Sequence, residues 1–187
     1  MAKNTEIEEL KKEIERLTGL INGINKNASE TKQEEVLFTS LCVGELNLTT
    51  KKYIDGGGEV YTFKNFGEEQ LIPYEDARDI IKNNKSFITG GLVFIHDKDM
   101  IEKYHLTKWY SKILDDDKMI DLFNSKIETF ESIFNDLPVF QQKTFKSLLE
   151  NKIIKKEKYD MNMVKIVDDA LHVDIISSIN NGKEIEE

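Results

Sequence analysis

The stretch from Leu71 to Leu106 constrains the fold of this chain more than any other, because its residues mark four successive elements with clear borders. Pro73 is expected in the first turn of a helix, where its missing N–H is not needed and its fixed φ fits. Gly90 and Gly91 predict a tight turn, since glycine accepts positive φ, and we expect only one of the two to adopt it. The continuous apolar run at 92–95 predicts a short strand covered on both faces. A second helix follows this strand.

Aspartates stand where several of the expected helices begin. Asp97 and Asp160 are predicted to cap the helices that follow them, because a carboxylate accepts hydrogen bonds from the free N–H groups of a first turn. The run Asp115-Asp116-Asp117 also raises the question of a metal site. Its residues are consecutive, however, whereas the ligands of a calcium loop are spaced so that they converge. We therefore expect the run to complement the dipole of a helix.

Near the N-terminus, apolar residues recur at alternating spacings of three and four, which is the heptad pattern of a coiled coil. The residues of this seam are Ile7, Leu10, Ile14, Leu17, Ile21 and Ile24. Ile at the a positions and Leu at the first two d positions favour a parallel assembly, a dimer or a trimer. The alternative is an amphipathic helix that lies on its own domain. The strict repeat favours self-association.

Strand signals follow a polar linker at 26–35. The segments 36–43 and 46–54 are rich in branched and aromatic residues, and a third such segment spans 59–63. A glycine-rich reversal at 55–58 separates the last two segments, which predicts a hairpin. A glycine loop can also hold phosphate, but only before a helix N-terminus, and here a strand follows.

The apolar pattern is helical from residue 125 onward, and Pro138 is expected to begin a helix. The apolar residues of that helix are Phe140, Phe145, Leu148 and Leu149. Short connections between the helical stripes predict a bundle.

The expected fold is therefore α+β and mostly helical. An N-terminal coiled-coil helix occupies 1–25 and a linker 26–35. A small antiparallel β unit and the central helix-turn-strand-helix body occupy 36–124, and a C-terminal helical bundle occupies 125–187.

The net charge of −9 disfavours a general nucleic-acid binder, which needs a basic surface to neutralise phosphates. A local exception is the lysine cluster Lys152, Lys155, Lys156 and Lys158, which Glu157 interrupts. Such a short run most often marks a solvated helix end. The sequence contains no run of apolar residues long enough for a membrane span, and its charged N-terminus does not resemble a signal peptide.

Cysteine and histidine are scarce in this chain. Cys42 is the only cysteine, and its apolar neighbours predict a buried, unreactive thiol. The histidines are His96, His105 and His172, and no two of them have the spacing of a zinc-binding pair. No nucleophile motif or dinucleotide fingerprint occurs. We expect no catalytic, cofactor-binding or metal-binding residues, and hence no enzyme.

Several short motifs between about Tyr61 and Asn181 resemble a known group of proteins. They are IPYED, SFITGGLVFIHD with a following helix that ends YHL, FNDLPVFQQKTFKSLLENKIIKKEK and VDIISSINN. With them the chain resembles a loosely related set of small proteins encoded by tailed bacteriophages and prophages of Gram-positive bacteria. The resemblance implies a virion-associated or assembly component, and it supplies no activity and no ligand residues.

These observations predict a non-enzymatic phage protein that self-associates and docks on other virion proteins, located in the virion or in the host cytoplasm during assembly. The alternative is a soluble regulatory or host-takeover adaptor that binds a host protein. A third class, a metal-dependent enzyme, would require bound metal.

Overall fold

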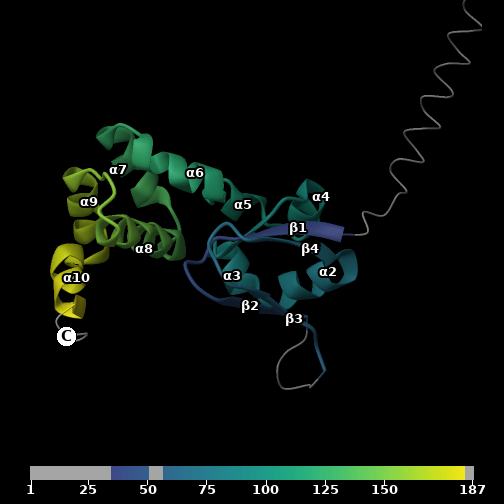
Figure 1. Ribbon diagram of the computed structural model, residues 1–187. Coiled ribbons are helices and arrows are strands. Elements are labelled where there is room, and N and C mark those ends of the chain that lie inside the picture. The colour runs from purple at the N-terminus through teal and green to yellow at the C-terminus, as the bar shows by residue number, and fades with distance from the viewer. Residues whose placement is uncertain (1–34, 51–56, 184–187) are drawn as a thin grey trace, which may run out of the picture. The chain divides into compact units, whose positions relative to one another are not determined.

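The computed structural model describes residues 35–50 and 57–183 (Figure 1). The predicted heptad seam at 7–24 and the linker up to residue 34 lie outside the described residues. Within the described part the chain is α+β, with many helices and a small antiparallel sheet.

The strand β1 (Glu35–Ser40) is the central strand of a three-stranded sheet with the order β4-β1-β5. Both neighbours, β4 (Glu69–Pro73) and β5 (Val93–Ile95), run antiparallel to it. The predicted hairpin is confirmed, because β2 (Leu46–Thr49) pairs antiparallel with β3 (Val60–Phe63). Glu35, which the prediction placed in the linker, already belongs to β1.

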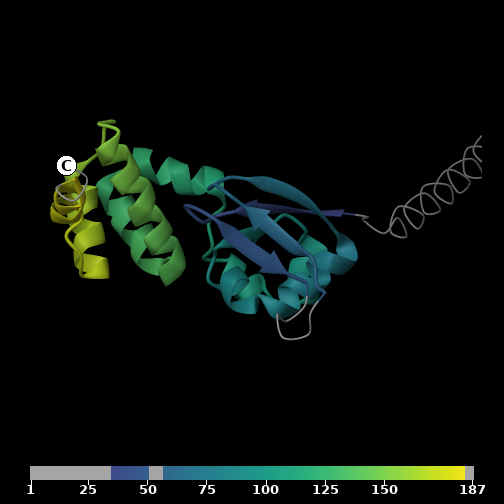
Figure 2. The ribbon, with the colours of Figure 1, turned by 60° about the horizontal axis from the view of Figure 1, so that its bottom comes forward.

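The helices of the first half lie around these strands (Figure 2). They are α2 (Tyr74–Asn83), α3 (Lys85–Thr89), α4 (Lys98–Lys103) and α5 (Thr107–Tyr110). The placement of Pro73 in the first helical turn is wrong by one position: it ends β4 and directly precedes α2, with an extended ψ of 138°. A proline has no N–H for the strand ladder, so it suits a strand end equally well.

A first hydrophobic core fills the space between this sheet, the hairpin and α2 to α4. Its larger members are Phe38, Leu48, Phe63, Ile72, Ile80, Ile88, Ile95 and Met100. Alternate residues of β1, Val36 and Phe38, point into it, as the two-residue period of a strand requires.

The second half is helical. Its elements are α6 (Asp116–Asp121), the 3₁₀ helix η2 (Leu122–Asn124), α7 (Ile127–Asp136), α8 (Val139–Ile154), α9 (Met161–Leu171) and α10 (Ile175–Lys183). A second core forms between them, with a cluster of phenylalanines, Phe130, Phe134 and Phe145, at its centre. Met119 and Leu122 belong to this core, so the helical part starts earlier than the predicted border at residue 125. Pro138, like Pro73, precedes its helix rather than beginning it.

The start of α8 joins the two halves. Thr144 Oγ1 donates a hydrogen bond to the carbonyl of Leu41 at 2.9 Å. The buried Gln141 amide bonds to both backbone groups of Leu114: its Oε1 accepts from the N–H at 3.0 Å, and its Nε2 donates to the carbonyl at 2.6 Å. We call this contact the α8 joint.

Gly90 and Gly91 face the same joint. Gly91 has a φ of +77° and Gly90 a φ of −83°, so only one of the two is at positive φ, as expected. A Cβ on Gly90 would lie 2.3 Å from a ring carbon of Phe140, and one on Gly91 would lie 2.7 Å from Cγ of Gln141. The pair is therefore needed for the close approach of α8 as well as for the turn. Phe140, which was expected to be a core residue, remains 38% exposed beside Gly90.

Candidate binding groove

The histidines occupy three separate places in the fold. His96 follows β5, and its Nε2 lies 2.7 Å from the Thr39 hydroxyl. His105 and His172 both have positive φ, at 57° and 54°, and each lies in the turn that ends a helix, α4 and α9 respectively. Their place is thus explained by backbone geometry. Among the residues that the structure describes, no three His, Cys, Asp or Glu side chains come together as a metal site would require.

The predicted aspartate caps are confirmed. Asp97 Oδ1 accepts from the Met100 N–H at 2.8 Å, and Asp160 Oδ1 from the Asn162 N–H at 2.8 Å. Asp115 caps α6 in the same way. Burial alone would raise the pKa of Asp115, but hydrogen bonds from the Lys118 ammonium and backbone N–H lower it overall. These carboxylates thus serve the helix ends, as the dipole argument requires.

Cys42 is only half-buried, although its apolar neighbours predicted full burial. Burial still raises the pKa of its thiol, which lowers the fraction of reactive thiolate at neutral pH.

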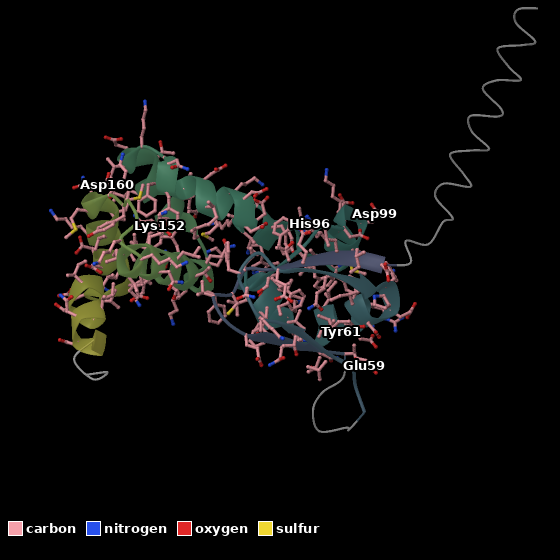
Figure 3. The ribbon with its side chains drawn as sticks, in the orientation of Figure 1. Glu59, Tyr61, His96, Asp99, Lys152 and Asp160 are labelled. Carbon is pink, nitrogen blue, oxygen red and sulfur yellow. The ribbon has the colours of Figure 1, made fainter. Side chains whose placement is uncertain are left out.

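A solvent-open groove lies on the helical half, between η2 and the segment that connects α8 to α9. Its larger hollow has a volume of about 810 Å³ and is lined on one side by Phe123, Asn124 and Ser125. The opposite side is formed by residues 157–161, and Lys152 and Met163 also contribute. Figure 3 shows Lys152 on α8 and Asp160 at the start of α9. We call this feature the α8–α9 groove.

Phe123 gives the groove a fixed aromatic surface. It is half-buried, and its ring stacks on that of the core residue Phe145 with centroids 4.4 Å apart. The Lys152 ammonium lies 5.2 Å from the centroid of the Phe123 ring, within the range of a cation–π contact. The aromatic surface and one cation are thus held side by side.

Lys152 also binds Glu157, with Nζ and Oε2 2.9 Å apart. The hydrogen bond from Lys152, together with the positive charges of Lys152 and Lys155, lowers the pKa of Glu157, so its carboxylate is ionised at neutral pH. The helix end sets this geometry: the Lys156 N–H bonds to Ile153 O and the Glu157 N–H to Lys152 O, with Lys156 at a φ of 57°. This is the pattern of a Schellman turn, which usually has glycine in the place of Lys156.

A second hollow of about 280 Å³ adjoins the first. It shares Phe123, Lys152 and Glu157 with the larger one and adds Ile120 and Lys155. Because their linings overlap, the two hollows form one elongated groove with the Lys152–Glu157 pair at its middle.

Apolar side chains remain in contact with water along this groove. Met161 is 50% exposed, Ile120 45% and Tyr159 39%. The exposed lysines Lys155 and Lys158 belong to the same lining. Ammonium groups, amides and exposed apolar side chains thus line the same groove.

The sequence identified the lysine cluster but not the groove. Phe123 precedes Lys152 by about 30 residues in the chain, and the two side chains meet only because η2 packs on α8. One available signal was the pair of large apolar residues, Tyr159 and Met161, that directly follow the lysines in a segment expected to be polar.

No family model, no curated protein and no solved structure matches this chain. Over the described residues, no helix has both the length and the apolar character needed to cross a membrane. The function must therefore be inferred from the residues of the chain and from the resemblance of its motifs.

Proposed function

We propose that this chain is a non-enzymatic structural or accessory protein of a tailed bacteriophage, which self-associates and docks on other proteins of the particle or of its assembly. The observation that carries the docking role is the α8–α9 groove, where Phe123 and Lys152 lie among water-exposed apolar side chains. Interfaces between proteins combine aromatic and apolar residues at the centre with a polar, hydrated rim.

The phage assignment is supported by the motifs of the resemblance. Two of them, SFITGGLVFIHD and FNDLPVFQQKTFKSLLENKIIKKEK, meet in space: Gly90 and Gly91 from the first face Phe140 and Gln141 from the second. These motifs thus specify the α8 joint, which is an architectural feature. The resemblance thus supports an architectural role for these motifs and carries no mechanism.

The self-association role falls to the heptad seam, which lies outside the described residues. If the seam brings two or three copies together, the assembly presents two or three grooves at once. Linked binding sites act with a high effective concentration, so a groove of modest affinity would suffice for stable docking.

Mass spectrometry of purified particles from the encoding phage tests the proposal. We expect peptides of this chain in the particles, in a fixed ratio to a known capsid protein. Absence from both particles and assembly intermediates would refute the virion role. If a tagged chain then captured a host protein from lysate, the adaptor alternative would replace it.

A further inference from the structure

We propose that the α8–α9 groove binds an acidic, amphipathic segment of a partner protein, with its apolar residues on Met161, Ile120 and Tyr159 and its carboxylates against Lys155 and Lys158. This inference rests on the proposed docking function and names the chemistry of the partner.

The shape of the groove favours an elongated occupant. Two hollows, of about 810 and 280 Å³, meet at the Lys152–Glu157 pair and are open to solvent along their length. A small ligand is usually enclosed on most sides. A helix or an extended peptide can instead lie across both hollows and place successive apolar residues in each.

The charges of the groove favour carboxylates on the occupant. Its two acidic residues are already engaged: Glu157 binds Lys152, and Asp160 accepts hydrogen bonds from the backbone and side chain of Asn162. Lys155 and Lys158 form no ion pair within the described residues. The lining holds three lysines, Lys152, Lys155 and Lys158, and these two acidic residues, so the net charge of the groove is positive although the chain as a whole carries −9.

The apolar residues favour a polypeptide over a nucleic acid. Met161, Ile120 and Tyr159 expose 50%, 45% and 39% of their surfaces, and burial against a partner's apolar side chains would remove this area from water. Methionine adapts its shape to different apolar partners. The phosphate contacts that dominate nucleic-acid binding would leave these apolar side chains exposed to water.

The test uses the full chain and a fluorescein-labelled helical peptide with Leu and Phe at helical spacing on one face and Glu at the other positions. Fluorescence anisotropy measures its affinity at low and at physiological salt. A second peptide has Gln in place of every Glu, and a third has Ser in place of Leu and Phe. We expect only the first to bind well, with an affinity that falls as salt rises.

Two protein variants locate the binding. Replacing Lys155→Glu and Lys158→Glu together should weaken the acidic peptide about ten-fold or more at low salt, because two attractive contacts become repulsive. Lys165→Glu and Lys143→Glu together change the net charge equally at exposed helical positions that do not line the groove, so they serve as the matched control. Circular dichroism of each variant verifies its fold.

Equal weakening by both double variants, equal binding of the Gln peptide, or tighter binding of a single-stranded oligonucleotide would each overturn the inference. If the chain is found in particles but does not bind the acidic peptide, docking occurs elsewhere and the proposed function stands. If the peptide binds through the lysines but the chain is absent from particles, the groove inference stands and the virion role falls.

Discussion

Replacing Gly91 by alanine should destabilise the protein by more than a positive φ alone explains. Gly91 has a φ of +77°, and a Cβ there would lie 2.7 Å from Cγ and 3.0 Å from Cδ of Gln141. The left-handed backbone costs an alanine roughly 1–2 kcal/mol. Displacing the Gln141 amide from its two bonds to Leu114 would leave buried polar groups without partners, which costs about 1–3 kcal/mol more. We expect Gly91→Ala to lower the free energy of unfolding by about 2–5 kcal/mol.

Gly67 provides the matched control. It has the same φ of +77°, but a Cβ there would meet only Asp116 Oδ2, at an ordinary 3.5 Å. Gly67→Ala should therefore cost only the backbone part, roughly 1–2 kcal/mol. The difference between the two variants isolates the packing of Gln141 against Gly91.

Urea unfolding measures both losses, with two probes. Trp109 is the only tryptophan and lies on α5, so its fluorescence reports on the first half. Far-ultraviolet circular dichroism instead reports on the helices of both halves. In the unaltered protein and in both variants the two transitions should coincide, so that each shift of the urea midpoint converts into a loss of free energy of unfolding. Equal losses for Gly67→Ala and Gly91→Ala would refute the packing argument, and no loss in either would refute the argument from φ.

Three further predictions concern other parts of the chain. Lys156→Gly should raise the free energy of unfolding by about 0.5–1 kcal/mol, because glycine removes the left-handed strain at φ 57° yet adds freedom to the unfolded chain; an unchanged or lower urea midpoint would contradict this. Tyr61 donates a 2.6 Å hydrogen bond to Asp76, and burial together with this bond raises its pKa from 10.0 to about 12. The neutral phenol thus stabilises the fold fully below pH 10, and this contribution is lost as the pH rises through 12, so Tyr61→Phe should flatten the fall in the unfolding midpoint over that window. A fall of the same steepness in Tyr61→Phe would assign the alkaline sensitivity to other groups. Ile14→Asp should dissociate the proposed dimer or trimer in light scattering and leave the circular dichroism of the body intact, whereas Lys12→Asp, on the outer face of the same predicted helix, should not; a monomeric wild type at high concentration would reject the seam.

Local patterns in the sequence predicted those parts of the fold that depend on neighbouring residues. Alternation and a glycine-rich reversal predicted the pairing of β2 with β3, and single aspartates predicted the caps of α4 and α9. In each case the interacting groups are close in the chain or face each other across one turn.

The parts that were missed depend on distant contacts. A single helix was expected before the turn at Gly90, but Asn84 divides it into α2 and α3. The Asn84 side chain donates to the carbonyls of both Ile80 and Thr49, at 3.1 and 2.9 Å, and the second of these lies in the hairpin. Periodicity along one segment cannot reveal such a bond to another segment. Met119 and Leu122 are a second example. Their apolar character predicts burial, but only the fold shows that they belong to the second core.

The helix α8 explains why the candidate groove was hardest to predict. An amphipathic helix with one neighbour has one apolar stripe. The start of α8 instead buries Gln141 and Thr144 at the joint, its middle buries Phe145 and Leu149 in the second core, and its end brings Lys152 to the groove. Polar residues at buried positions and a lysine over an aromatic ring therefore interrupt the stripe.

This arrangement has a consequence for docking. Gln141 and Lys152 lie on the same continuous helix, about 17 Å apart along its axis at 1.5 Å per residue. Buried polar groups tolerate only the register in which their partners are met, so the Thr144 bond to Leu41 and the close approach of Gln141 to Gly91 fix α8 against the first half. A partner held at the α8–α9 groove would then be held at a defined position relative to the sheet. We expect Gly91→Ala, which loosens the joint, to leave the affinity of the groove for the acidic peptide unchanged, because Gln141, which faces Gly91, does not line the groove; fluorescence anisotropy with this variant measures it.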